Sequence, residues 1–181
     1  MAQGEQLVTG DPSAAHHVAS NTPVWDDGAW TALPRLDGDA QADVCVVGLG
    51  GSGLTCIGEL LRLGVSVVGI DAGEVAGGAA GRNGGFLLAG AYDFYHDAVA
   101  EHGRERARRI YRITMDEVRR IVAETPEHAR ITGSLRIADS GEEVEDCRRQ
   151  MEALQADGFP VEWYEGPEGT GLLLPTDAVF N

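Results

Sequence analysis

The apolar positions near the start of the chain predict a strand, a helix and a second strand in succession. Residues 44–47 are a short continuous apolar run that ends in glycine, which is typical of a strand buried on both faces of a parallel sheet. Over residues 51–63 the apolar side chains recur every three or four positions, as on one helix face, and Gly64 provides a C-terminal stop. Residues 65–70 are a second β-rich run, so the segment predicts a βαβ unit.

The remainder of the chain is predicted to mix helices with strands. Apolar periodicity near three and a half predicts helices, and alternation or short apolar runs predict strands. The expected helices cover residues 93–100, residues 104–124 after a break at Gly103, and a segment from a capping box at Ser140 and Glu143 to about Gly158. The expected strands cover residues 133–138, 159–164 and 172–174.

A glycine-rich turn, GLGGSG, joins the first predicted strand to its helix. This G-x-G-x-x-G pattern indicates dinucleotide binding when it lies between a strand and a helix. Gly48 permits the tight turn, Gly50 leaves room for the pyrophosphate, and Gly53 lets the helix pack closely on the strand. Gly51 and Ser52 begin the helix, whose free N–H groups and positive dipole end attract phosphate.

An acidic residue closes the second predicted strand, about 20 residues beyond the glycine turn, as the fingerprint requires. Asp71 is suited to accept hydrogen bonds from both ribose hydroxyls, and its negative charge disfavours the 2′-phosphate of NADP. The fingerprint alone does not separate FAD from NAD, so an NAD-dependent dehydrogenase stays open as an alternative. Glycine and alanine crowd residues 73–90, which favours backbone packed close to a ligand over a flexible linker.

The segment after Asp71 resembles that of the D-amino-acid-oxidase-like family of FAD-dependent oxidoreductases. Its run Gly-Arg-Asn-Gly-Gly at residues 81–85 is most similar to the amine-oxidising branch that includes γ-glutamylputrescine oxidoreductase. The lead-in around Trp25 and the segment 132–138 match the family's layout more loosely. The resemblance implies FAD as cofactor, a small-molecule amine or amino acid as substrate, and oxidation of a C–N bond.

The resemblance also implies which residues contact the cofactor. The loop would pass the pyrophosphate towards the flavin, with Arg82 balancing phosphate charge and Asn83 hydrogen-bonding the cofactor. The expected cofactor-binding residues are Gly48, Gly50, Gly51, Ser52, Gly53, Asp71, Ala72, Gly81, Arg82, Asn83, Gly84 and Gly85. No catalytic residue and no metal site is predicted; His96, His102 and His128 are candidates by residue type alone.

The sequence departs from the family pattern in three respects. Ile57 stands where the family usually has a small residue between helix and strand, and Ala80 stands where a serine commonly precedes Gly-Arg-Asn. Family members are also much longer than these 181 residues. The resemblance therefore implies the N-terminal part of such an enzyme, expected to be inactive alone; a truncated, non-catalytic nucleotide-binding chain is the alternative.

The expected fold class is α/β, with a Rossmann-like FAD-binding βαβ domain and the beginning of a mixed α+β substrate domain. Residues 1–21 are rich in small and polar side chains and are expected to be a disordered leader. Residues 22–130 would form the N-terminal part of the FAD-binding domain with a helical insertion. Residues 131–181 would begin the substrate domain, which is incomplete.

Charge and cysteine content narrow the range of partners. A net charge of −15 argues against nucleic acid or an anionic membrane as partner, because phosphate binding needs clustered positive charge. No apolar run reaches the roughly 18 residues of a membrane span. Cys45, Cys56 and Cys147 lie in apolar patterns and are expected to be buried, reduced thiols of a cytoplasmic protein. The oligomeric state is left open.

Overall fold

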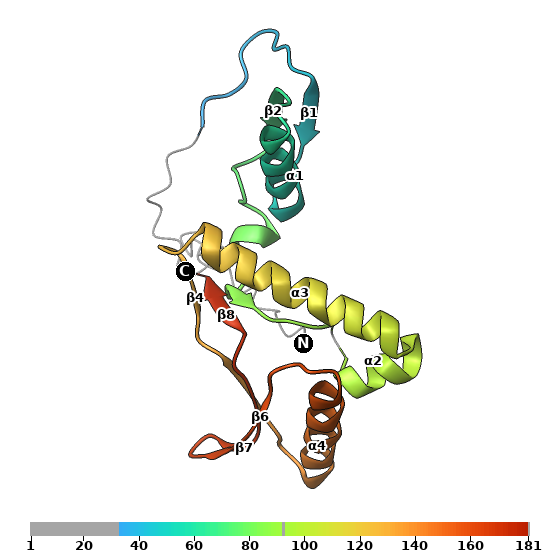
Figure 1. Ribbon diagram of the computed structural model, residues 1–181. Coiled ribbons are helices and arrows are strands. Elements are labelled where there is room, and N and C mark those ends of the chain that lie inside the picture. The colour runs from blue at the N-terminus through green and yellow to red at the C-terminus, as the bar shows by residue number, and fades with distance from the viewer. Residues whose placement is uncertain (1–32, 92, 181) are drawn as a thin grey trace, which may run out of the picture. The chain divides into compact units, whose positions relative to one another are not determined.

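The computed structural model describes residues 33–91 and 93–180, which belong to two compact units that divide after Arg82 (Figure 1). The expected leader over residues 1–21 and the tryptophan-containing lead-in at Trp25 lie outside the described residues. The domain boundary predicted at residue 130 separates residues expected to bind the cofactor from residues expected to bind the substrate. This division by function stays a prediction.

The first unit contains the predicted βαβ unit. Strand β1 (Val44–Val47) and strand β2 (Val67–Ile70) pair in parallel and in register, with helix α1 (Gly51–Arg62) between them in the chain. After α1 the backbone N–H of Gly64, at φ +74°, donates to Leu61, and the next N–H donates to Leu60. This left-handed glycine stop is the one that the sequence predicts.

None of the strand residues in the first unit is buried, contrary to the expectation that its strands are buried on both faces. Val47 is 78% exposed, and Leu49 is the single described side chain of this unit that is buried. The described part of the unit offers two strands and one long helix, so one sheet face has no covering layer within it. Cys45 of β1 and Cys56 of α1 are both exposed, which corrects the expectation of buried thiols, whereas Cys147 is buried in the second unit.

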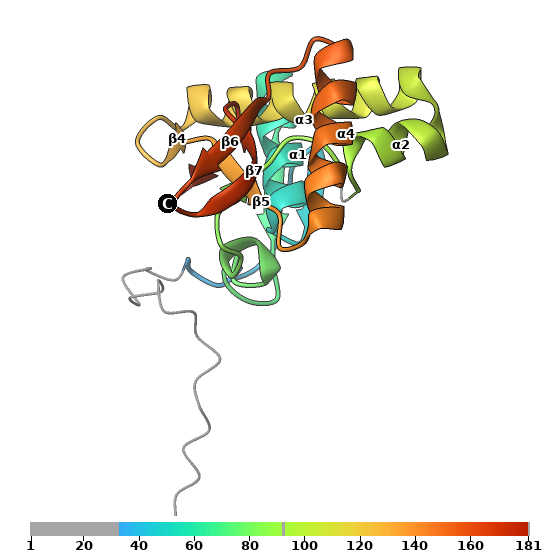
Figure 2. The same ribbon diagram turned by 90° about the horizontal axis from the view of Figure 1, so that it is seen from below.

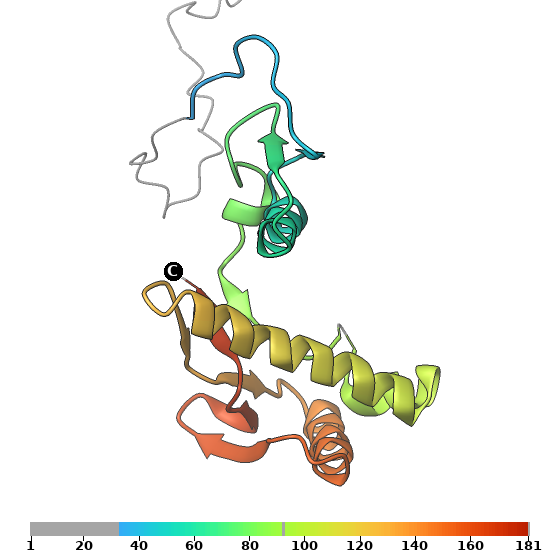
Figure 3. The same ribbon diagram turned by 45° about the horizontal axis from the view of Figure 1, so that its top comes forward.

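The second unit combines three helices with two antiparallel sheets. Its helices are α2 (Tyr95–His102), α3 (Arg104–Glu124) and α4 (Gly141–Ala156). One sheet has the order β3-β8-β4, with β3 (Phe86–Leu87), β8 (Ala178–Phe180) and β4 (Ala129–Ile131). The other has the order β5-β7-β6, with β5 (Ser134–Ile137), β7 (Gly169–Leu174) and β6 (Glu162–Gly166). Figure 2 shows the sharp turn from α2 into α3, and Figure 3 shows the β6–β7 hairpin beside α4.

The structure confirms the helix break and the helix cap that the sequence predicts in the second unit. Gly103 adopts φ +82° and separates α2 from α3. The backbone N–H of Glu143 donates to Ser140 Oγ at 3.2 Å, so Ser140 caps the helix as predicted, while the Glu143 carboxylate accepts from the N–H of Asp139, the residue before the cap, at 2.8 Å. The short strands β4 and β8 are absent from the sequence prediction, because three residues are too few to show a period.

An aromatic cluster forms the core of the second unit. Tyr95, Tyr111 and Phe159 pack with ring centroids 4.5 to 5.6 Å apart, in tilted or edge-on pairs. Leu154 of α4 and Leu172 of β7 are fully buried against this cluster. These contacts join α2, α3, α4 and the hairpin strands into one packed body, because each element supplies a side chain to the same core.

A buried carboxylate links the helices of this core. Asp157 accepts hydrogen bonds from the hydroxyl of Tyr95 and from Nε of Arg104, both at 2.9 Å. Burial alone would raise the pKa of Asp157, but the hydrogen bonds from Arg104 and Tyr95 outweigh it and hold this pKa below its ordinary value. Burial and the neighbouring carboxylate raise the pKa of Tyr95. The pair therefore stays as a neutral phenol donating to a charged carboxylate.

Candidate dinucleotide-binding site

A recess of about 650 Å³ lies at the carboxyl ends of β1 and β2 in the first unit. In α/β folds this end of a parallel sheet is where nucleotides bind. The recess is lined by the glycine turn, by Asp71 and by the small residues of the following loop, namely Val47, Gly48, Gly50, Gly51, Ser52, Gly53, Asp71, Glu74, Ala76, Gly77, Gly78, Ala79 and Ala80. Six of the predicted cofactor-binding residues are thus brought together here.

The geometry of the turn explains two of its glycines. Gly48 has φ +94°, a conformation that side chains rarely adopt, and its N–H donates to the carbonyl of Ile70 at 2.8 Å. A Cβ on Gly53 would lie 1.9 Å from the carbonyl oxygen of Gly48, so nothing larger than glycine fits between helix and strand. These two residues fix the shape of the recess through backbone geometry and close packing.

Gly50 and Gly51 have a different role, because they face open space. A Cβ on either residue would have no neighbour within 4 Å. Gly50 is the N-cap of α1, no side chain caps the helix, and its first turn has no acidic residue. The unsatisfied N–H groups and the positive end of the helix dipole therefore border the recess, which is the arrangement that binds phosphate.

Asp71 is fixed beside the glycine turn by two backbone groups. Its Oδ2 accepts from the N–H of Leu49 at 2.6 Å, and its Oδ1 accepts from the N–H of Gly73 at 2.9 Å. Both hydrogen bonds lower the pKa of Asp71, and the one from Leu49 has the larger effect. The carboxylate is therefore charged at neutral pH, and each oxygen keeps a second lone pair with which it could accept a ribose hydroxyl.

The loop after Asp71 is held against the turn by hydrogen bonds. The N–H of Ala76 donates to the carbonyl of Leu49 at 2.8 Å, and Nε of Arg82 donates to the carbonyl of Gly77 at 2.9 Å. A Cβ on Gly81 would lie 2.6 Å from the carbonyl oxygen of Ala76, where the loop closes in the short 3₁₀ helix η1 (Ala79–Gly81). Residues 73–90 were expected to pack close to a ligand, and Glu74 and residues 76–80 of that segment line the recess, although none of them was named among the cofactor-binding residues.

The other predicted cofactor-binding residues do not line this recess. Ala72, Gly81 and Arg82 belong to the first unit, and Asn83, Gly84 and Gly85 belong to the second. Oδ1 of Asn83 accepts from the N–H of Gly85 at 2.8 Å, and a Cβ on Gly85 would lie 2.1 Å from the carbonyl oxygen of Phe180. Gly85 is therefore required by its packing on β8, and a role for these residues at the cofactor stays a prediction. The histidines His96, His102 and His128 also belong to the second unit.

The structure accounts for the departure at Ile57. A Cβ built on Gly69 of β2 would lie 2.9 Å from Cδ1 of Ile57 and 2.8 Å from a methyl group of Leu49. The larger side chain on the helix is therefore matched by a residue without a side chain on the strand. The close approach of α1 to β2 is kept, and with it the shape of the recess.

The chain belongs to the family described as FAD dependent oxidoreductase (DAO), whose model matches residues 43–180. Among curated relatives it is 31% identical over 133 residues to the "Probable oxidoreductase OrdL" of Rhizobium meliloti (strain 1021), covering 71% of this chain and 31% of the relative. The Haemophilus influenzae protein of the same name is 29% identical over 86 residues, covering 48% of this chain and 20% of the relative. The chain thus spans less than a third of the length of these relatives.

Solved structures share the fold. The L-amino acid deaminase from Proteus vulgaris superposes with a TM-score of 0.60 at 19% identity, covering 83% of this chain and 37% of the other. The L-proline dehydrogenase from P.horikoshii superposes with a TM-score of 0.52 at 20% identity, covering 77% of this chain and 38% of the other. The family match confirms the α/β FAD-binding fold class and FAD, not NAD, as the cofactor.

Among the described residues no group of histidine, cysteine, aspartate and glutamate side chains is arranged to hold a metal ion. None of the helices in the described part of the chain has the length and apolar character of a membrane span.

Proposed function

We propose that the recess holds the ADP half of FAD in an oxidoreductase that oxidises a C–N bond of an amine or amino acid. The observation that carries the first part is the open face at Gly50 and Gly51 beside the uncapped start of α1. A pyrophosphate could approach the backbone there and accept hydrogen bonds from the first N–H groups of the helix. Asp71, already oriented by Leu49 and Gly73, would receive the ribose hydroxyls.

Each group around the recess has a defined role in binding FAD. The recess binds and orients through backbone groups, and Asp71 excludes a 2′-phosphate through its charge. FAD, when bound, would supply the acceptor for the hydride, and with it the two electrons, that leaves the carbon bonded to nitrogen. Arg82 would contribute positive charge close to the pyrophosphate, since the bond from its Nε to the carbonyl of Gly77 holds the guanidinium beside a residue that lines the recess.

The choice of a C–N bond is supported by two indications outside the recess. The Gly-Arg-Asn-Gly-Gly run resembles the amine-oxidising branch of the family. Two structural neighbours are named for amino-acid substrates, as an L-amino acid deaminase and an L-proline dehydrogenase. Because the chain spans only part of the length of these proteins, the substrate and the reaction are proposed for the protein that carries these residues.

Cofactor binding is tested with the full chain and two glycine variants. FAD is titrated into wild type, Gly50→Val and Gly58→Ala, and binding is followed by flavin fluorescence. The Cβ of Gly50→Val would have no protein atom within 4 Å, so the side chain should fill the open face and weaken binding at least tenfold. Gly58 also has no neighbour at its Cβ position but lies outside the recess, so it should tolerate alanine. Equal affinities for wild type and Gly50→Val, or NAD bound more tightly than FAD, would contradict the proposal.

The reaction is tested on flavin-containing protein isolated from its own host. Amines, amino acids and matched 2-hydroxy acids are added without oxygen, and bleaching of the flavin absorbance and release of ammonia are measured. Amines or amino acids should bleach the flavin and release ammonia. Bleaching by the hydroxy acids alone would show that the enzyme oxidises C–O bonds, which would overturn the proposed reaction while leaving the cofactor site intact.

A further inference from the structure

The turn before β3 contains an asparagine that is followed by glycine, the pair Asn83–Gly84. Asparagine occurs at positions 21, 83 and 181 of the sequence, and only Asn83 precedes a glycine. Asparagine is thermolabile, because the backbone nitrogen of the next residue can attack its side-chain carbon Cγ and close a five-membered ring. A side chain on that next residue hinders the attack, and glycine has none. The pair therefore has the composition of a site that can modify itself.

Both residues of this pair are accessible to water and to base. Asn83 and Gly84 are exposed, and they lie outside the helices and strands, between η1 and β3 in the chain. Within the described part of the chain the N–H of Gly84 donates to no hydrogen-bond acceptor. Removal of its proton by hydroxide therefore breaks no hydrogen bond of the fold, and the nitrogen becomes a nucleophile.

The side chain of Asn83 is already folded back over the attacking atom. Its Oδ1 accepts from the N–H of Gly85 at 2.8 Å, which closes a turn through the asparagine side chain. The nitrogen of Gly84 belongs to the ring of atoms that this bond closes. Cγ of Asn83 therefore cannot turn away from that nitrogen while the bond is kept.

The N–H of Gly85 has a second effect, on the oxygen that gains negative charge. When the nitrogen attacks Cγ, electrons of the C=O bond move to Oδ1, and a donor already placed at 2.8 Å stabilises that charge. Packing on β8 fixes this donor. The carbonyl oxygen of Gly85 accepts from the N–H of Phe180 at 2.7 Å, and a Cβ on Gly85 would lie 2.1 Å from the carbonyl oxygen of Phe180. The fold thus holds an oxyanion donor beside Asn83.

We propose that Asn83 deamidates spontaneously and that the folded turn promotes the reaction. Hydroxide removes the N–H proton of Gly84, the nitrogen forms a bond to Cγ, and the bond from Cγ to Nδ2 breaks. Nδ2 takes up a proton from water and leaves as ammonia, so a succinimide remains. Water then opens this ring at either carbonyl, which gives aspartate or isoaspartate. The net change consumes water and releases ammonia, and it needs no oxidant or reductant.

The two products differ in their effect on the second unit. Aspartate adds a negative charge but keeps an acceptor for the N–H of Gly85. Isoaspartate also adds a methylene group to the backbone before Gly84, so the closely packed Gly85 cannot keep its position against Phe180. Isoaspartate should therefore loosen β3 from β8 and lower the melting temperature, whereas the variant Asn83→Asp should keep the strand pair.

The test is incubation of the full chain in mildly alkaline buffer, followed by peptide mass spectrometry and enzymatic methylation of isoaspartate. Asn83 should convert from amide to acid, while Asn21, which precedes threonine, should stay unchanged. In a parallel incubation urea unfolds the turn, and the folded chain should convert at least as fast as the unfolded one. Slower conversion of the folded chain would overturn the claim that the turn promotes the reaction, and an unconverted Asn83 in both would overturn the site.

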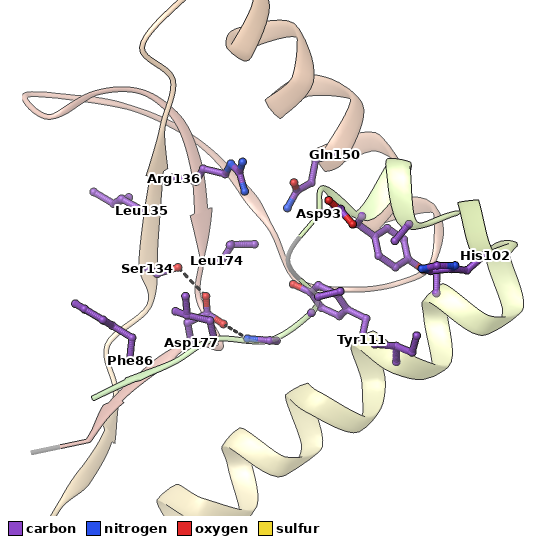
Figure 4. Close-up of a pocket in the computed structure, with 18 residues that line it drawn as sticks. Phe86, Asp93, His102, Tyr111, Ser134, Leu135, Arg136, Gln150, Leu174 and Asp177 are labelled. Carbon is purple, nitrogen blue, oxygen red and sulfur yellow. Dashed lines mark hydrogen bonds between the residues drawn. The ribbon is translucent and has the colours of Figure 1, made fainter. Parts of the chain in front are cut away.

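A matched variant shields the nitrogen of Gly84 without removing the turn. The Cβ of Gly84→Ala would lie 2.9 Å from the ring of Phe86, which is 73% exposed and can move aside. Figure 4 shows Phe86 at the margin of the cavity that it borders, apart from Tyr111. Gly84→Ala should slow the conversion at least tenfold. Gly141→Ala, in the same unit and with no neighbour at its Cβ position, should leave the rate unchanged. A wild-type rate in Gly84→Ala would contradict the proposed attack by this nitrogen.

Discussion

The two units of this chain achieve their structure by different means. In the first unit Leu49 is the single described side chain that is buried, and the recess is shaped by Gly48, Gly53 and the backbone bonds of Asp71. In the second unit an aromatic cluster and fully buried leucines pack three helices on antiparallel strands. The nucleotide recess therefore depends on the absence of side chains, whereas the second unit depends on their volume.

This difference predicts opposite sensitivities to mutation. Removing a side chain should matter in the second unit and have little effect in the first, because packing energy scales with buried apolar volume. Adding a single methyl group should matter at the glycine turn, because protein atoms already occupy the space beside Gly53.

Leu154→Ala should have the largest effect on stability. The residue is fully buried in the core of the second unit, and such truncations cost about 2–5 kcal/mol. The matched change Leu54→Ala on α1, where the leucine is 41% exposed, should cost less than about 1 kcal/mol. Urea unfolding measures both, and a similar cost for the two would remove the contrast between the units.

Gly53→Ala should abolish FAD binding while sparing the second unit. The new methyl group would meet the carbonyl oxygen of Gly48 at 1.9 Å, so α1 must move away from β1 and the recess loses its shape. Flavin fluorescence reports the loss of binding. Hydrogen exchange in α3 and α4 should match wild type; if exchange there rises together with the loss of FAD, the two units do not respond separately.

Acidic pH should lower the free energy of unfolding of the second unit through protonation of Asp157. Its pKa in the folded chain is lower than the ordinary 3.8, so its contribution is present above that value and is lost as the pH falls through the folded pKa. Asp157→Asn should therefore flatten the acid limb of the stability profile. Asp71→Asn serves as the control, because it removes an exposed carboxylate of the first unit. It should leave the acid unfolding of the second unit unchanged.

Gly58→Ala should have the smallest effect and the opposite sign. Gly58 lies within α1 with no neighbour near its Cβ position, and alanine is favoured over glycine in a helix by about 1 kcal/mol. A small rise in stability of the first unit with unchanged FAD affinity is expected from thermal melts. A loss of affinity would show that helix flexibility, and not the open face at Gly50, governs binding.

The sequence predicted the features that depend on local chemistry. The glycine turn, the stop at Gly64, the break at Gly103 and the helix cap at Ser140 are each determined by residues close in sequence, and the structure confirms them. The FAD-binding fold class followed from the spacing between the turn and Asp71 and from the resemblance beyond it. The family match confirms that class.

Features that depend on distant residues could not be predicted in this way. The exposure of Val47 and of Cys45 depends on which layers cover the sheet, and an apolar run does not reveal this. Gly85 was assigned to the cofactor loop, whereas its close packing against Phe180 arises from a pairing across the whole second unit. The hydrogen bond from Tyr95 to Asp157 joins residues of separate elements that share no sequence motif.

The most direct test of the account is to follow backbone amides by NMR as ADP is added to the full chain. The largest chemical-shift changes are expected at Gly50, Gly51 and Ser52, with smaller ones at Asp71 and residues 76–80, because these groups line the recess. Amides of α3 and α4 should stay unchanged. Shifts concentrated in the second unit, or none at the glycine turn at saturating ADP, would contradict the claim that this turn is the nucleotide site.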